Sequence, residues 1–242
     1  WFRVADEEPV DTVYLGEDVR SNRAPFFDHH IEEVADRLKR GGKRVIWSTL
    51  AEVVSKHDRK ITESFCTMDD VEANDVSALN FLSGKPHRIG QYLNVYNEET
   101  VRHLAKNGAN HFCLAAELPL ETIQELAKVA ASVAASVEVQ IFGRVSLALS
   151  ARCYHARAHG RTKDNCLLVC EKDTDGLDLK THSGKPFLSI NGIQTLSDKY
   201  LVLASEVPDL QSSGVASFRL SPHTHDMTKI AAAYRQLLGG SI

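Results

Sequence analysis

The stretch HIEEVADRLKRGGKRVIWST, residues 30–49, places a helix directly before a short strand. Its first half carries apolar side chains three and four residues apart, which is the spacing of one helical face, and two glycines end it. Its second half, KRVIWST, is a short apolar run typical of a buried strand. The stretch therefore predicts one helix–strand unit of an α/β fold.

The same alternation of apolar runs and amphipathic segments continues on both sides of this stretch. We expect parallel strands near residues 12–16, 44–48, 70–73, 90–95, 111–115, 137–142 and 216–220. Parallel neighbours need crossover connections, which are usually helices. A long series of such units favours a closed barrel over an open sheet. We therefore predict an α/β fold of the (β/α) TIM-barrel type, formed by a single domain over residues 1–242.

The composition excludes several classes of protein. The net charge is -4, whereas a nucleic-acid-binding domain favours a basic face. No apolar run approaches the length of a membrane-spanning helix, and the first residues lack the pattern of a secretory signal. The first expected strand leads into YLGED, whose single glycine does not fit a dinucleotide-binding loop. We expect a cytoplasmic protein without a nucleic-acid partner or a transmembrane segment.

The segment at about residues 150–183 interrupts the alternation and predicts a long inserted loop. It holds three of the five cysteines, Cys153, Cys166 and Cys170. An odd cysteine number with such clustering favours a metal site over a disulfide framework. Thiolates bind zinc or iron–sulfur clusters. Zinc would add His155 or His159 as a fourth ligand, and the remaining alternative is that the cysteines are incidental.

Barrel enzymes place their active sites at the carboxyl ends of the strands. The polar residues at or just after the expected strand ends are Glu17, Ser48, Glu72, Asn94, Glu117, Glu138 and Asn191. The alternative for each of them is a helix N-cap or a solvated turn. No residue is identified as catalytic. We expect the substrate-binding residues to be among Glu17, Glu72, Asn94, Glu138 and Asn191.

The segment SARCYHARAHGRTKDNCLLVC, residues 150–170, followed by FLSINGIQTLS, residues 187–197, resembles the U32 peptidase family. Further segments that carry the resemblance are VYLGEDVRSNR (13–23), VIWSTLAEV (45–53), LNVYNEETVRHL (93–104) and FRLSP (218–222). Within the family, the chain is most similar to one subunit of a pair that acts in oxygen-independent ubiquinone biosynthesis. The resemblance implies a barrel fold, of which this chain lacks the family's first strand.

The resemblance also implies a cofactor and partners. These are a [4Fe–4S] cluster held by four cysteines, a homologous subunit in a heterodimer, and an aromatic or prenylated quinone precursor as substrate. Cys153, Cys166 and Cys170 match three of the four ligand positions, and Arg20 stands at the fourth. A guanidinium has no lone pair for iron. The alternatives are a cluster with three cysteines and an open iron, a substitute such as His29 or His30, loss of the cluster, or a natural protein with a different residue at position 20.

Three functions remain open at this point. The first is the iron–sulfur subunit of an O₂-independent hydroxylase, which would make the chain part of an enzyme. The second is peptide hydrolysis, although the sequence has neither an HExxH zinc pair nor a G-x-S-x-G elbow. The third is a non-catalytic, metal-stabilised partner protein.

Overall fold

A computed structural model describes residues 7, 9–17, 19, 21 and 28–239, which fall into two compact units. The first unit comprises the described residues within 1–141, 203–219 and 228–242. The second comprises residues 142–202 and 220–227. None of the helices in the described ranges has the length and apolar character that crossing a membrane requires. The single domain over residues 1–242 stays a prediction.

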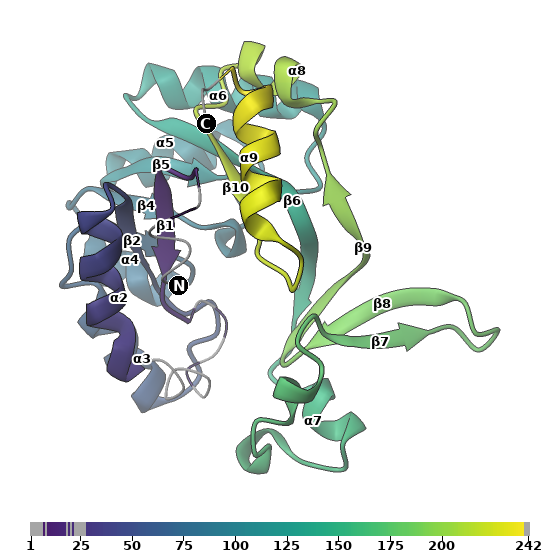
Figure 1. Cartoon of the computed structure of the whole chain (residues 1–242). Helices are drawn as coiled ribbons and strands as arrows, with labels where there is room; N and C mark the ends of the chain where they lie inside the picture. Colours follow the sequence, from purple (N-terminus) through teal and green to yellow (C-terminus); the bar gives the residue numbers. More distant parts are fainter. Residues whose placement is uncertain (1–6, 8, 18, 20, 22–27, 240–242) are drawn as a thin grey trace. The chain divides into compact units, whose positions relative to one another are not determined.

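The first unit is built on a curled half-barrel sheet of parallel strands (Figure 1). Its strands, each paired with the next in chain order, are β1 (Thr12–Leu15), β2 (Arg44–Ser48), β3 (Val71–Ala73), β4 (His87–Ile89), β5 (Ala109–Cys113) and β6 (Ser136–Leu149). A further strand, β10 (Ser217–Leu220), pairs with β6. This arrangement confirms the predicted α/β class with mostly parallel strands, and it is compatible with a TIM-barrel-like fold. The absence of a first strand stays a prediction.

Helices connect these strands and cover one face of the sheet. They are α2 (Asp28–Arg40), α3 (Lys56–Phe65), α4 (Val76–Leu82), α5 (Glu98–Lys106) and α6 (Leu120–Ser132), followed late in the chain by α8 (Val207–Ser212) and α9 (Met227–Leu237). The strands turn buried apolar side chains such as Val71, Ile89 and Phe112 towards this layer, where Leu38 and Leu126 are also buried. This apolar layer explains why the sequence alternates as it does.

The opposite face of the same strands is polar. The strand register aligns Ser48, Glu72, Arg88, His111 and Ser136 in one row across β2 to β6. Side chains at paired positions of parallel strands point to the same side of the sheet. Because successive residues alternate between faces, the row lies opposite the helices and within the curl of the half-barrel. The interior of this unit is therefore lined by groups capable of chemistry.

Two expected elements lie elsewhere in the structure. The strand expected at residues 90–95 is β4, at His87–Ile89, and residues Gln91–Leu93 form a 3₁₀ turn. Gly90 sits where an added Cβ would lie 1.8 Å from Asn74 Oδ1, and Asn94 has a left-handed φ of 51°, so the extended run ends early. The segment LAEVVSKH, residues 50–57, predicts a helix directly after β2, but the helix begins only at Lys56, where Ser55 caps it.

The second unit is an antiparallel sheet with short helical turns. The later part of β6 pairs with β9 (Gln194–Val202), β9 with β8 (Pro186–Asn191), and β8 with β7 (Leu177–Lys180). The cysteine-rich segment contains α7 (Tyr154–Ala158) and the 3₁₀ turns η3 (Lys163–Asn165) and η4 (Val169–Lys172). Its reading as a functional insertion stays a prediction.

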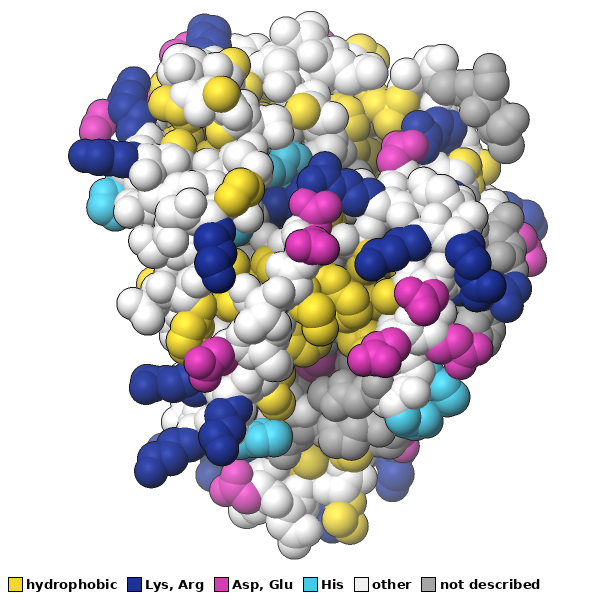
Figure 2. Space-filling view, turned by 90° about the vertical axis from the view of Figure 1, so that its left-hand side faces the viewer, with side chains coloured by type: hydrophobic (Ala, Val, Ile, Leu, Met, Phe, Trp, Pro, Cys, Tyr) yellow, Lys and Arg dark blue, Asp and Glu magenta, His cyan; other side chains and the backbone are white. Residues whose placement is uncertain are grey.

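Acidic and basic side chains are interspersed on the face shown in Figure 2. This agrees with a net charge of only -4. The face therefore offers no field of a single sign that would attract a polyanion.

Candidate functional site

A buried ion cluster occupies the interior of the first unit. Arg219 of β10 donates from Nε to Glu138 Oε1 at 2.5 Å and from Nη2 to Glu72 Oε1. The side chains of Glu72 and Glu138 are only 1% and 4% exposed, and that of Arg219 is 12% exposed. One guanidinium thus bridges two carboxylates that come from β3 and β6.

Further polar side chains surround Glu138. Tyr14 donates its hydroxyl hydrogen to Glu138 Oε2 at 2.9 Å, and its ring lies beneath Arg219, 3.8 Å from the guanidinium carbon to the ring centroid. Ser217 donates to the same oxygen at 3.2 Å, and Nε2 of His111 lies 3.5 Å from it. Three strands, β1, β5 and β10, therefore contribute groups around a single carboxylate on β6.

The cluster controls the protonation of its members. Burial alone would raise the pKa of Glu138, but the charge of Arg219 and the hydrogen bonds of His111 and Tyr14 outweigh it, and the pKa lies well below its usual range. Burial and the neighbouring Glu138 raise the pKa of Tyr14. Burial also raises the pKa of the Cys113 thiol. The cluster therefore combines an ionised carboxylate with a neutral phenol and a neutral thiol.

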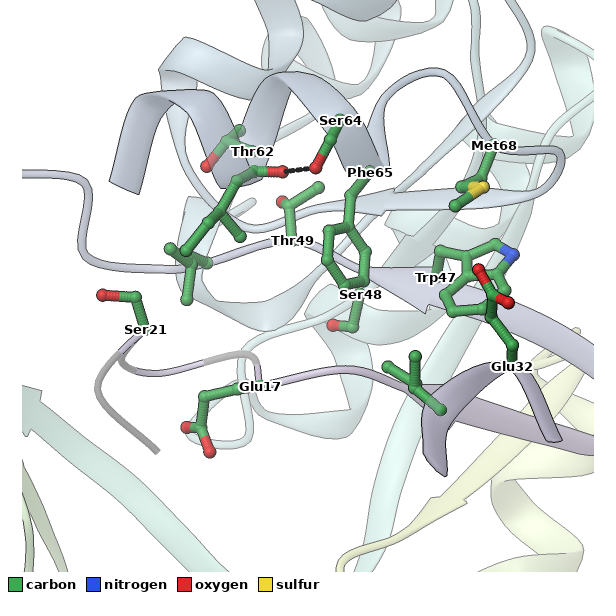
Figure 3. A pocket seen from close by; sticks show the side chains of 13 residues that line it. Glu17, Ser21, Glu32, Trp47, Ser48, Thr49, Thr62, Ser64, Phe65 and Met68 are labelled. Atoms are coloured by element: carbon green, nitrogen blue, oxygen red, sulfur yellow. Dashed lines mark hydrogen bonds between the residues drawn. The ribbon is translucent and has the colours of Figure 1, made fainter. Parts of the chain in front are cut away.

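A pocket of about 230 Å³ adjoins this cluster through Ser48. Ser48 lines the pocket and donates to Glu72 Oε2 at 2.8 Å. Figure 3 shows the rings of Trp47 and Phe65 in the lining, with Glu32 beside Trp47 and Ser48 beside Phe65. The lining comes from β2, from the segments after β1 and β2, from α2, and from α3 and the residues that follow it. An apolar ring with one polar substituent fits such a lining.

The sequence-predicted candidates have different positions in the structure. Glu72 and Glu138 come together on either side of Arg219, and Glu17 lines the adjoining pocket. Asn94 is exposed at the end of the 3₁₀ turn after β4. Asn191 belongs to the second unit, where it pairs with Gln194 at the β8–β9 hairpin. The substrate-binding role of all five candidates stays a prediction.

The other two polar residues at strand ends, Ser48 and Glu117, form hydrogen bonds with nearby side chains. Ser48 joins the pocket to the buried cluster, as described above. Glu117 accepts a hydrogen bond from the hydroxyl of Tyr96, and both side chains are exposed. Arg219 was not among the predicted site residues. FRLSP carried the family resemblance, but nothing local in it indicates that its arginine faces two carboxylates.

The three clustered cysteines lie in the second unit. Cys153 is buried at the N-cap of α7, where its sulfur accepts the N–H of Ala156 at 3.4 Å. Cys166 is buried and accepts the N–H of Leu168 at 3.4 Å. Cys170 is half-buried within η4. The Cys153 thiol also donates to the carbonyl oxygen of Gly192 at 3.3 Å. N–H···S bonds such as those of Cys153 and Cys166 also occur around the ligands of iron–sulfur clusters.

The donor set for a four-cysteine cluster is incomplete. Arg20, at the fourth expected ligand position, lies outside the described residues. The sequence places Cys66 in an expected helix and Cys113 in an expected strand, which predicts plain core packing for both, and both are buried in the first unit. The residues that would hold a cluster are thus Cys153, Cys166 and Cys170. A cluster of this kind would supply one-electron redox chemistry.

A different group of ligand atoms lies in the same segment. His155, His159 and Asp173 bring one ligand atom each within 4.8 Å of one another. Within the described residues, no other set of three or more His, Cys, Asp or Glu side chains meets this distance. The sulfurs around a four-iron cube lie farther apart than the ligands of one ion, so the cluster prediction remains open.

Comparison with models of known protein families assigns the chain to a family. A model described as Peptidase family U32 matches residues 2–240. The chain belongs to peptidase family U32. The match extends over both compact units, including the cysteine-rich segment that carried the resemblance. No solved structure matches the chain.

Proposed function

We propose that this U32-family chain is the iron–sulfur subunit of an O₂-independent hydroxylase of ubiquinone biosynthesis, equivalent to UbiV. Its partner would be a homologous UbiU-like subunit, and its substrate a small aromatic or prenylated quinone precursor. The observation that carries the proposal is the set Cys153, Cys166 and Cys170. Two of these thiols are buried in one short segment and accept backbone N–H bonds, contacts that are common around the ligands of iron–sulfur sites.

The first unit supplies a suitable environment for the substrate. A hydroxylated aromatic ring needs an apolar pocket with a few polar groups that fix its orientation. Trp47 and Phe65, whose ring centroids lie 5.8 Å apart, provide the apolar walls. Ser48 and Glu17 provide polar atoms at the pocket, and Ser48 connects it to the Glu72–Arg219 pair. In this proposal Glu72 and Glu138 orient the polar end of the substrate through Arg219 and Ser48.

Peptide hydrolysis is the second candidate, and the family's name supports it. A cysteine peptidase needs a thiol with a lowered pKa, whereas burial raises the pKa of both Cys113 and Cys66. The third candidate is a non-catalytic partner that a metal stabilises. Release of peptides from an unstructured protein substrate by the purified chain would favour the second candidate over the hydroxylase.

Iron binding tests the proposal directly. The parent protein and Arg20→Cys would be reconstituted anaerobically side by side, and iron and acid-labile sulfide measured per chain. We expect Arg20→Cys to bind more iron and to resist air longer, because a thiolate replaces a group that cannot coordinate iron. Cys170→Ser should lower iron binding, and Cys66→Ser, a buried cysteine of the first unit, is the matched control.

Two results would contradict parts of this proposal. Equal and full occupancy in the parent and in Arg20→Cys would mean that another residue completes the site. No iron in either protein would remove the cluster and favour the non-catalytic partner.

A further inference from the structure

Two histidines and one aspartate of the second unit converge on a single point. Nε2 of His155 lies 2.8 Å from Asp173 Oδ2, and Nε2 of His159 lies 3.2 Å from the same oxygen. The two imidazole rings are stacked, with centroids 5.4 Å apart and planes inclined by 15°. Three atoms that commonly bind divalent metals therefore face one another.

Local structure brings these side chains together. His155 and the C-cap residue His159 are four residues apart at α7, so they share one face of the helix. Asp173 caps the end of η4, where its N–H donates to the carbonyl of Cys170 at 3.3 Å. α7 packs against η4, which turns the Asp173 carboxylate towards both imidazoles.

The hydrogen bonds of His155 fix the direction in which its Nε2 points. Nδ1 lies 3.1 Å from the carbonyl oxygen of Ile190, which only accepts, so Nδ1 carries the hydrogen. In the neutral ring Nε2 then has a lone pair, and that lone pair faces a carboxylate oxygen at 2.8 Å. Two acceptors at this distance need a proton or a metal ion between them. The His155 side chain is 0% exposed, so its packing and these two contacts hold the ring in one orientation.

The surroundings match those of a metal centre that keeps an open side. A backbone carbonyl that fixes the tautomer of a ligand histidine is the usual outer contact of such sites. The side chains of His159 and Asp173 are 28% and 26% exposed, so solvent reaches the group from one side. Two imidazoles and one carboxylate with open positions suit Zn²⁺ or Fe²⁺.

We propose that His155, His159 and Asp173 bind one divalent transition-metal ion, with Nε2 of each histidine and the Asp173 carboxylate as ligands and water in the open positions. This centre uses no cysteine, so it is separate from an iron–sulfur cluster on the neighbouring thiols. It does not depend on the proposed hydroxylase function.

The test is a titration of the metal-free full chain with Co²⁺ under anaerobic conditions. Thiolate-bound Co²⁺ shows intense sulfur-to-metal charge-transfer absorption in the near ultraviolet, whereas Co²⁺ on imidazole and carboxylate shows only weak visible bands. We expect one Co²⁺ per chain of the second kind, displaced by Zn²⁺. Cys170→Ser should leave this ion in place, because the half-buried thiol is not among its ligands.

Substitutions at the two solvent-accessible ligands complete the test. His159→Gln and Asp173→Asn should each weaken Co²⁺ binding by roughly tenfold or more. His182→Gln is the matched control, because His182 is an exposed histidine of the same unit. Zn²⁺ should raise the Tm of the parent but not of these two variants. Unchanged Co²⁺ affinity in His159→Gln and Asp173→Asn, or sulfur charge-transfer absorption from every bound ion, would overturn the proposal.

Discussion

Replacing Arg219 by methionine removes the guanidinium that bridges Glu72 and Glu138. Both carboxylates stay almost inaccessible to water, at 1% and 4% exposure. Breaking a buried ion pair by removing one partner costs about 3–5 kcal/mol, because the remaining charge is uncompensated. With two carboxylates on one cation, we expect Arg219→Met to lower the free energy of unfolding by about this amount near pH 8.

The loss should depend on pH in a defined direction. In the parent the pKa of Glu138 is lowered, so its contribution to stability is present above the unfolded pKa and is lost as pH falls through the folded pKa. Without Arg219, burial dominates and raises the pKa of Glu138 above its unfolded value. The folded variant then binds the extra proton, so its stability rises as pH falls. The difference between parent and variant should therefore be smaller near pH 5 than near pH 8.

Urea unfolding followed by far-ultraviolet circular dichroism measures both effects. A loss of about 3–5 kcal/mol moves the unfolding midpoint down by roughly 1 to 2 M urea. Arg44→Met is the matched control, because Arg44 pairs with Asp70 at 2.6 Å but the two side chains are 53% and 41% exposed. Such a pair is worth about 0–1 kcal/mol. Equal losses in the two variants, or a loss for Arg219→Met that does not change with pH, would refute the reasoning.

Two more substitutions probe the packing of the first unit by the same unfolding measurement. Gly90→Ala should lower the free energy of unfolding by about 1–3 kcal/mol, because the added Cβ would lie 1.8 Å from Asn74 Oδ1 and displace that buried amide. Stability equal to that of the parent would contradict the close approach. Tyr234→Phe should lower the free energy of unfolding by only about 1 kcal/mol. The carbonyl of Ile141 loses a 2.9 Å hydrogen bond but keeps the one from the N–H of Leu203. A loss of several kcal/mol would mean that the hydroxyl has another role.

The order of strands and helices in the first unit was predictable because each buried strand is a short apolar run followed by an amphipathic helix. VEA at residues 71–73 and VIWS at 45–48 both lie within predicted strands. The strand β9 was not predicted. Its burial does not alternate cleanly along the strand, and its pairing with β6 is a long-range contact that no local pattern encodes.

The candidate site was only partly predictable for the same reason. Glu72 and Glu138 were recognisable as carboxylates on expected barrel strands. Their partner Arg219 comes from a distant strand, and only the pairing of β10 with β6 brings it to them. His155 and His159 were candidate ligands by residue type. Asp173 was missed, because its approach to them depends on the packing of α7 against η4.

Because Arg219 pairs with both Glu72 and Glu138, the first unit can complete its buried ion cluster only after β10 has been synthesised. Arg219 follows Glu72 by 147 residues and Glu138 by 81 residues. While the chain is being made, β3 and β6 therefore leave the ribosome with their carboxylates long before β10 exists. Two ionised carboxylates are not buried without a cation, so the nascent half-barrel keeps its interior wet or protonated until then. β10 thus supplies the cation that the buried carboxylates need, and a chain that stops short of β10 has an N-terminal portion whose polar face remains exposed to water and to chaperones.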